Sequence, residues 1–530
     1  MSDSKKQSFL HGTALLAMAT ALVKIIGALY KIPLNAIIGE QGFAYFTTAY
    51  EIYNVLLMIA TAGLPVAMSR MVSEQSSLGH YNQVRRTYKT AKLLFMTLGI
   101  IGTLLMTVFC RELAQFQQQP DAWAAIGALG PCVLLICVMS AYRGFFQGQS
   151  NMLPTAVSQV LEALCKLIVG MIAAILLLKM TDSIPFAAAG AILGVTASCA
   201  LSAVYLSRCF RKSFAAMPQS QEQAQPYGQT AKQLLLIAIP ITIGSAGLSI
   251  LTMLETKIYM GQLLSLGFTQ GEADTMKGIY DFSKTIFNMP CAFITPITIS
   301  IIPAIASHLS LKNHQEAKAT EESALRILGL ISMPCAVGLA VLARPVMALL
   351  GGYTGEKLAL ATSLMTILGV CIVFNSLVLL TNAMMQSHGH VNLPVVNMFI
   401  GGILKLVAVY ILTGNPNIGI VGGPIGSLLC HFTITVLNLI TMRRCIAHPP
   451  AVVKNLLRPA LAALIMGIFT WGSWYGLQMV TSSRLILCAL PVMVGVVVYG
   501  FTAIKIKVIT RADCLMLPKG EKIAKLLRLQ

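Results

Sequence analysis

Charge is scarce in this chain of 530 residues, of which only 11% are charged, with 19 acidic residues against 38 basic ones. An average soluble domain carries about a quarter charged residues, so this composition excludes a globule surrounded by water. The chain also lacks a GxxxxGK[ST] phosphate loop, which argues against ATP hydrolysis, and it lacks GxSxG and HExxH motifs. We therefore expect neither an enzyme nor any catalytic residue.

Metal-ligand spacing is missing as well, because the 13 cysteines are scattered singly, most of them inside apolar runs. We expect them to be small core residues and predict no metal and no cofactor. The net charge of +19 would suggest nucleic acid in a soluble protein, but no basic stripe interleaved with aromatic residues is present. The sequence therefore predicts no nucleic-acid partner.

Long apolar runs dominate what is present, with 56% hydrophobic residues and a mean hydropathy of +0.75. A spanning helix needs roughly 20 apolar residues, and windows of that length predict about fourteen helices. The predicted segments lie near residues 10–38, 43–69, 90–109, 122–142, 153–178, 184–206, 233–254, 278–307, 325–350, 357–385, 392–413, 418–441, 456–479 and 485–504. The fold class is an all-α polytopic membrane protein, with kinks expected at the prolines in the first, second and eighth segments.

The basic residues sort to one side when the loops are assigned alternately. About two thirds of them, including the pairs at 85–86 and 443–444 and the tail 505–528, fall on the side of the amino terminus. Cytoplasmic loops carry such an excess, so both termini are predicted to be cytoplasmic. Adding or removing one central helix would destroy this asymmetry, which favours an even number of helices.

A polar stretch near the middle of the chain divides the helices. Residues 208–232 contain a Gln/Pro-rich run that cannot bury enough apolar area to fold alone, and we interpret them as a cytoplasmic linker. The predicted organisation is an N-terminal six-helix lobe (1–207), this linker, a C-terminal six-helix lobe (233–442), and a terminal helix pair with a basic tail (443–530).

Matched positions indicate that the two lobes are duplicates. The residues around Pro65 match those around Pro303 at an offset of 238. Around the fifth and eleventh spans the matched pairs, at offsets of 239, 240 and 239, are Gln147 and Gln386, Pro154 and Pro394, and Lys166 and Lys405. Six helices per unit preserve orientation, so the repeats are parallel and related by an axis along the membrane normal. A central cavity with its binding site near the midplane is expected between them.

Charged side chains within the predicted spans mark the candidate site. Each costs about 2.5–3.5 kcal/mol to insert at the bilayer centre, so those that persist tend to face a cavity or a partner. The candidate cavity residues are Lys24, Lys31, Glu51, Lys166, Asp281, Lys284 and Lys405. Glu162 with Lys166, and Asp281 with Lys284, have the spacing of intrahelical pairs, and Lys31 could instead reach the interface by snorkelling. Because lysine outnumbers carboxylate in this set, we predict an anionic substrate, with phosphate as the leading candidate.

Several short runs resemble one transporter family. They are KIIGALYKIPL (24–34), IGEQG (38–42), AYEIYN (49–54), GLPVAMS (63–69), RGFFQG (143–148) and NMP (288–290). Together they resemble the polysaccharide-biosynthesis branch of the multidrug/oligosaccharidyl-lipid/polysaccharide (MOP) exporter superfamily, and within it the stage V sporulation protein B group. The resemblance covers nearly the whole chain and is less specific to one substrate than to the group.

That group is similar to lipid II flippases, which have fourteen helices and work by alternating access. The resemblance implies a bacterial plasma-membrane protein that moves a lipid-linked sugar pyrophosphate, the peptidoglycan precursor lipid II in particular, from the inner to the outer leaflet. A first-span arginine of those flippases matches Lys24, a second falls near Tyr30 or Lys31, and one in the eighth span falls near Lys284 or Thr285. Lysine in place of arginine loses the two-pronged hydrogen bonding to phosphate.

Three other functions are to be weighed against the same sequence. An ion-coupled multidrug or cation antiporter of the same superfamily would need an acidic, aromatic cavity, and a non-transporting cell-wall scaffold would tolerate loss of the interior lysines. A membrane glycosyltransferase would need a sizeable acidic outer loop, and the longest one expected, residues 257–277, has only two acidic residues. Transport would be driven by Na⁺ or H⁺ coupling or by the membrane potential. The expected partners are the bilayer, the lipid-linked substrate and, potentially, cell-wall synthesis enzymes.

Overall fold

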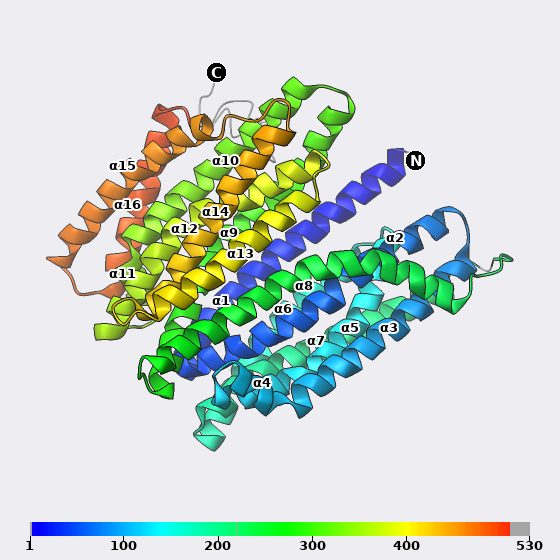
Figure 1. Ribbon diagram of the computed structural model, residues 1–530, viewed down its shortest axis with the longest axis horizontal. Helices are drawn as coiled ribbons and strands as arrows, with labels where there is room; N and C mark the ends of the chain where they lie inside the picture. The colour runs from blue at the N-terminus through cyan, green and yellow to red at the C-terminus, as the bar shows by residue number, and fades with distance from the viewer. Residues whose placement is uncertain (1–2, 219, 509–530) are drawn as a thin grey trace. The chain divides into compact units, whose positions relative to one another are not determined.

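The computed structural model describes residues 3–218 and 220–508, without the side chains of 3–17, 21, 24, 25, 296, 297, 299, 300, 303 and 304. Helices make up its regular structure, and no strand occurs within these ranges, which confirms the all-α prediction (Figure 1). The long helices are α1 (Asp3–Met58), α3 (Tyr81–Val108), α5 (Trp123–Gly148), α6 (Leu153–Thr181), α7 (Ile184–Ala215), α8 (Tyr227–Ser265), α9 (Gln270–Ser310), α10 (His314–Val341), α12 (Gly355–Ser387), α13 (Asn392–Thr413), α14 (Gly422–Cys445), α15 (Val452–Gln478) and α16 (Arg484–Lys505). Shorter elements are η1 (Ile59–Gly63), α2 (Leu64–Ser77), α4 (Cys110–Phe116), η2 (Pro120–Ala122), α11 (Ala343–Leu350) and η3 (Gly419–Val421).

Twelve helical segments in the described part of the chain are long and apolar enough to cross a membrane. The first of them, Ile26–Ser77, is 52 residues long and therefore exceeds the roughly 20 residues of one span. Helix α9, at 41 residues, is also longer than one span needs. The polytopic architecture is confirmed, and the total of fourteen spans in two lobes stays a prediction.

Helix α1 contains the turn between the first two predicted segments. Gly39 there has φ +69° and ψ 179°, a backbone conformation open to glycine and strained for other residues. The hydrophobic pattern places the segment boundary at residues 38–43, so the break coincides with the predicted end of the first span. Farther on, the π-helical turn η1 precedes Pro65 in the first turn of α2, the position at which proline is tolerated.

Helix boundaries recur at the offset expected from the sequence repeat. Helix α5 ends at Gly148 and α12 at Ser387, while α6 begins at Leu153 and α13 at Asn392, so both differences are 239. Helices α7 and α14 begin 238 residues apart, at Ile184 and Gly422. The repeat thus extends from isolated residues to the helices that carry them.

The chain forms two compact units, Met1–Gly278 and Ile279–Gln530. Within the first unit α6 packs on α7, and α5 packs on both α3 and α7. Within the second unit α13 packs on α14, α10 on α12 and α15, and the terminal helices α15 and α16 lie side by side (Figure 1). The division falls inside α9, whose first two turns belong with the first unit.

The connection before α9 is much shorter than the sequence suggests. Helix α8 ends at Ser265 and α9 begins at Gln270, so four residues separate them. The expectation of a long outer loop at 257–277 is therefore wrong. Charged residues at 272–277 lower the hydropathy of that window, although in the structure they belong to a helix.

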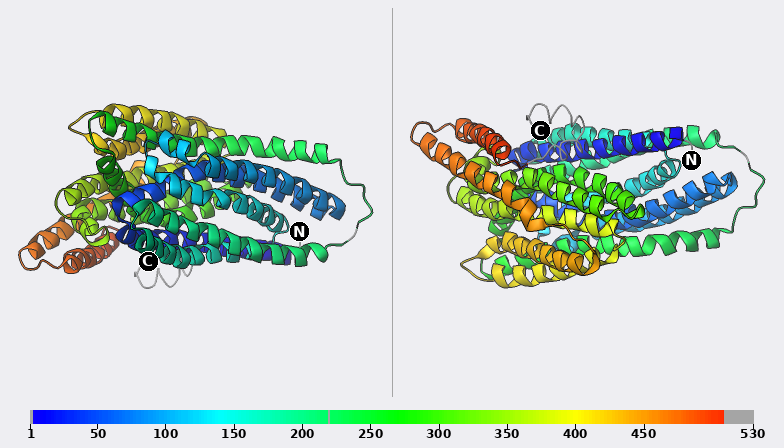
Figure 2. Two further views of the ribbon diagram at one scale, coloured as in Figure 1. Left: turned by 90° about the horizontal axis from the view of Figure 1, so that it is seen from below. Right: turned by 90° about the horizontal axis from the view of Figure 1, so that it is seen from above.

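Between α7 and α8, the described residues 216–218 and 220–226 are held against the start of α3. The Asn82 side chain donates hydrogen bonds to the carbonyls of Ser220 (2.6 Å) and Glu222 (3.1 Å). The Gln83 backbone N–H donates to the Glu222 carboxylate at 3.0 Å, and the Gln83 side-chain oxygen accepts from the Gln225 N–H at 2.8 Å. We call this segment the strap; in Figure 2 it passes beyond the ends of α7 and α8.

Candidate functional site

One face of α9 carries charges of alternating sign. Asp274, Lys277, Asp281 and Lys284 are spaced by three, four and three residues, which places all four on the same side of a helix. Three of these side chains are at most 3% exposed, and the Lys284 side chain is 26% exposed. Buried charges persist only when they are paired or serve a ligand, so this face, the charged face of α9, is the candidate site.

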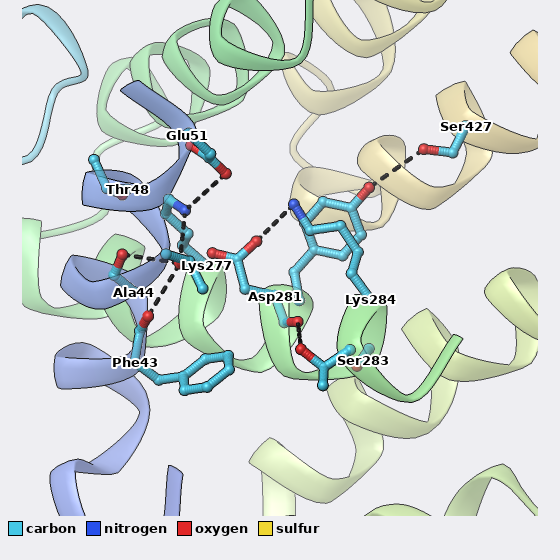
Figure 3. A network of polar contacts seen from close by, with 12 residues as sticks. Phe43, Ala44, Thr48, Glu51, Lys277, Asp281, Ser283, Lys284 and Ser427 are labelled. Atoms are coloured by element: carbon cyan, nitrogen blue, oxygen red, sulfur yellow. Dashed lines mark hydrogen bonds and ion pairs between the residues drawn. The ribbon is translucent and has the colours of Figure 1, made fainter. Parts of the chain in front are cut away.

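Lys277 is paired with the predicted site residue Glu51 of α1. Its ammonium donates to Glu51 Oε1 at 3.5 Å and to the Thr47 hydroxyl at 3.3 Å, as Figure 3 shows for the ion pair. The Lys277 side chain is fully buried and that of Glu51 is 10% exposed. The Glu51 carboxylate thus has a cationic partner from another helix, Lys277, which the sequence analysis did not select.

Asp274 lies one turn earlier and is the centre of a second group of hydrogen bonds. It accepts from the Tyr45 hydroxyl (3.1 Å), the Gln119 amide (2.7 Å) and the Gln270 amide (3.1 Å). The side-chain oxygen of Gln119 in turn accepts a hydrogen bond from the Thr48 hydroxyl of α1. These contacts fasten the beginning of α9 to α1 and to the α4–η2 turn. Both carboxylate oxygens of Asp274 accept at least one hydrogen bond.

Asp281 and Lys284 form the predicted intrahelical pair. The ammonium of Lys284 lies 2.6 Å from Asp281 Oδ1 and 4.5 Å from the centre of the Tyr280 ring (Figure 3). The Tyr280 hydroxyl is 3.5 Å from that of Ser427 on α14. Lys284 is the most exposed of the four charges, and a partly exposed ammonium can be reached by an anion.

The remaining predicted residues have separate surroundings. Lys166 on α6 lies 5.9 Å from the centre of the Tyr30 ring, and Glu162 is bound at 3.1 Å by Arg143 of α5. Glu162 thus has a cross-helix partner in Arg143 in addition to its predicted electrostatic interaction with Lys166. Lys31 on α1 and Lys405 on α13 are both half-buried.

Lys24 falls within α1, but its side chain lies outside the described part of the structure. Among the described residues, no group of three or more His, Cys, Asp or Glu side chains could hold a metal ion.

A large apolar cavity lies in the second unit, beside α9. Its volume is about 770 Å³, and α9, α10, α11, α15 and α16 line it. The only lining hydroxyls are those of Thr470 and Tyr499, and Tyr499 donates to the Leu330 carbonyl at 3.0 Å. Such a lining offers almost no hydrogen bonds and suits a hydrocarbon chain.

Helix α9 separates this cavity from Lys284. The cavity-lining residues Ile286 and Met289 follow Lys284 by two and five positions, which at about 100° per residue is roughly 140–200° around the helix. At nearly one depth, α9 thus presents a cation on one face and an apolar cavity on the other. The cavity gave no signal in the sequence, because its lining comes from helices that are distant along the chain.

Comparisons with known proteins identify the family. The family model described as "Polysaccharide biosynthesis protein" matches residues 9–309, and the MatE model matches residues 278–411. Stage V sporulation protein B of Bacillus subtilis (strain 168) is 26% identical over 444 residues, which are 83% of this chain and 84% of that protein. Lipid II flippase MurJ of the same organism is 24% identical, with 75% of this chain and 76% of that protein covered.

Solved structures share the fold. Lipid II flippase MurJ in an inward closed conformation superposes with a TM-score of 0.69 at 13% identity, covering 92% of this chain and 98% of that one. An inward-facing multidrug resistance MATE family transporter of the MOP superfamily gives a TM-score of 0.66 at 14% identity, covering 81% and 97%. The chain thus shares its fold with MOP superfamily transporters, and the family match over more than half of its length shows that it belongs to the polysaccharide biosynthesis protein family.

Proposed function

We propose that this protein is a flippase that moves a lipid-linked sugar pyrophosphate, with lipid II as the leading candidate, from the inner to the outer leaflet by alternating access. The observation that carries the proposal is the two-faced α9, with Lys284 on one side and the apolar cavity on the other. An amphiphile with an anionic head and a long hydrocarbon chain matches these two environments. The relationship to stage V sporulation protein B and to lipid II flippase MurJ supports this substrate class.

Lys284 is the residue proposed to meet the pyrophosphate. Its Asp281 partner holds the ammonium in place, while its 26% exposure makes it accessible to phosphate oxygens. A hydrogen bond to a charged group contributes about 1.5–3 kcal/mol, so loss of the ammonium should weaken substrate binding by about ten- to a hundredfold. Lys24, Lys31, Lys166 and Lys405 complete the proposed cationic set, while Glu51 pairs with Lys277 and Asp281 pairs with Lys284.

The test is transbilayer movement of a fluorescent lipid II analogue in proteoliposomes. Lys284→Ala should slow the movement at least about tenfold, and Lys284→Arg should retain most of it. Lys454→Ala, which removes an exposed lysine of α15, is the matched control and should move lipid at the wild-type rate. The proposal is wrong if wild-type protein does not move the analogue, or if Lys284→Ala moves it normally.

We further propose that an ion gradient or the membrane potential supplies the energy, with both termini in the cytoplasm. Imposing Na⁺, H⁺ and potential gradients separately on the same vesicles identifies the driving force. A rate that is independent of all three would contradict coupling.

The second candidate is a multidrug or cation antiporter, which the MatE match over residues 278–411 favours. Lys284 counts against it, because the most exposed charge on this face is an ammonium, which repels a cationic drug. Efflux of a fluorescent cation from the same vesicles, in the absence of lipid II movement, would replace the flippase proposal with this one.

A further inference from the structure

Two helices of the first unit carry exposed apolar stripes that end in basic residues. On α3, exposed Leu93, Met96, Ile100 and Leu104 are preceded on the same side by Lys89 and Lys92. On α7, exposed Leu193, Leu201 and Val204 are followed at helical spacing by Arg208 and Arg211. In a membrane transporter these apolar stripes face hydrocarbon, so the four cations lie at the level of the lipid headgroups.

Aromatic contacts between α3 and α7 join these two basic ends. We call this group, which consists of Tyr88, Phe210 and Phe214, the aromatic seam. The Tyr88 ring of α3 stacks on Phe210 of α7, with 4.2 Å between the ring centres and 26° between the planes. Tyr88 also lies 5.7 Å from Phe214, and the Arg85 guanidinium lies 5.6 Å from the centre of that ring. Lys89 adjoins Tyr88 in sequence and Arg211 adjoins Phe210, so cations flank the seam on both helices.

Some basic residues at this end already have protein partners. Arg85 donates to the Met217 carbonyl at 3.0 Å, and the Arg86 guanidinium lies 3.9 Å above the Tyr227 ring. By contrast, no described residue forms an ion pair with Lys89, Lys92, Arg208 or Arg211. The nearby Glu222 carboxylate is bound by the strap contacts with Gln83. Four cations thus flank the seam without an ion pair in the part of the chain that the structure describes.

We propose that this seam binds an anionic diacyl phospholipid of the cytoplasmic leaflet. Its phosphate lies among Lys89, Lys92, Arg208 and Arg211, and its two acyl chains follow the apolar stripes of α3 and α7. Basic sites between helices at this membrane surface suit anionic headgroups, and each Lys or Arg contributes about a factor of five in binding. A resident lipid here would hold α3 and α7 together at the end where the strap begins. The proposal does not depend on the transported substrate, because the seam and its flanking cations share no residue with the charged face of α9.

The experiment measures the lipid retained by the full-length protein after reconstitution with equimolar phosphatidylglycerol and phosphatidylcholine. Mass spectrometry of the purified protein–lipid complexes gives the ratio of the two bound lipids. The variant combines Lys89→Gln, Lys92→Gln, Arg208→Gln and Arg211→Gln, and we expect at least about a tenfold drop in bound phosphatidylglycerol. A monodisperse elution profile verifies that each protein is folded.

The matched control removes four exposed charges from the second unit, through Arg443→Gln, Arg444→Gln, Lys454→Gln and Arg458→Gln. It should retain phosphatidylglycerol at the wild-type level. Equal losses in both variants, or no loss in the first, would overturn the proposal and leave these residues as orientation signals. Displacement of the bound lipid by millimolar inorganic phosphate would also overturn it, because a diacyl lipid held by its chains as well as its phosphate resists a free anion.

Discussion

The buried ion pair between Lys277 and Glu51 allows a quantitative test of how α9 is fastened to α1. At 3.5 Å and an effective dielectric constant of about 20, two unit charges attract each other by about 5 kcal/mol. Removing one partner of a buried pair costs about 3–5 kcal/mol, because the other charge is left in an apolar environment. Since the Lys277 side chain is fully buried, we expect Glu51→Ala to destabilise the protein by about 3–5 kcal/mol.

Replacing both partners should behave differently. In Glu51→Leu combined with Lys277→Met no charge is left uncompensated, so the double variant should lie within about 1 kcal/mol of wild type. The measurement is the free energy of unfolding by sodium dodecyl sulfate titration in mixed micelles. If the double variant recovers stability but not lipid movement, the pair has a role in transport beyond holding the helices together.

The matched control is the pair between Arg143 and Glu162, whose side chains are 16% and 27% exposed. Water screens a partly exposed pair, so Glu162→Ala should cost no more than about 1 kcal/mol. The reasoning fails if Glu51→Ala costs as little as Glu162→Ala, or if the Glu51 and Lys277 replacements destabilise additively.

Three further predictions concern packing, the strap and the apolar cavity. Gly278→Ala should destabilise the protein by more than about 1 kcal/mol in the same unfolding assay, because the new Cβ would overlap the Glu40 carbonyl oxygen. Asn82→Ala should raise the rate at which a glutamate-specific protease cuts after Glu222 about fivefold or more, because it removes two hydrogen bonds that hold the strap. Gly338→Leu should fill part of the cavity and slow the movement of a long-chain lipid substrate several-fold, while a short-chain analogue moves normally.

The predictions for Gly278 and Asn82 each have a control variant nearby. Gly261→Ala on α8 meets open space and should stabilise the protein by up to about 1 kcal/mol. Gln229→Ala, an exposed change just after the strap, should leave cleavage unchanged. A Gly278→Ala protein as stable as wild type, unchanged cleavage in Asn82→Ala, or equal slowing of both substrates by Gly338→Leu would contradict the corresponding argument.

Local sequence patterns were sufficient to predict the helices. The contacts of the candidate site, by contrast, join residues that are far apart in the sequence. Hydropathy located the apolar segments, and the break at Gly39 falls where two of them meet. The spacing of Asp281 and Lys284 predicted their pair, because both residues lie on one helix. The partners of Glu51 and Glu162 come from other helices, and a single sequence contains no record of which helices become neighbours.

Lys277 and Asp274 were missed for a related reason. Their charges lower the local hydropathy, so a window of apolar residues ends before it reaches them. The signal that could have found them is the three- and four-residue spacing of alternating charges, which continues from Asp281 and Lys284 toward the amino terminus of α9. The periodic spacing of charged residues is therefore as informative as hydrophobic periodicity for locating helices in a membrane protein.

The strap changes how motion passes between α7 and α8. A free chain of eleven residues, such as 216–226, would be an entropic spring with a root-mean-square length of roughly 18 Å. Such a spring would absorb small displacements of either helix at almost no free-energy cost. Because Asn82 and Gln83 hold the segment by hydrogen bonds, that slack is absent, and a displacement of the start of α8 is transmitted to α3 until those bonds break. The connection therefore transmits displacements that are too small to break these hydrogen bonds and releases α8 from α3 when they break.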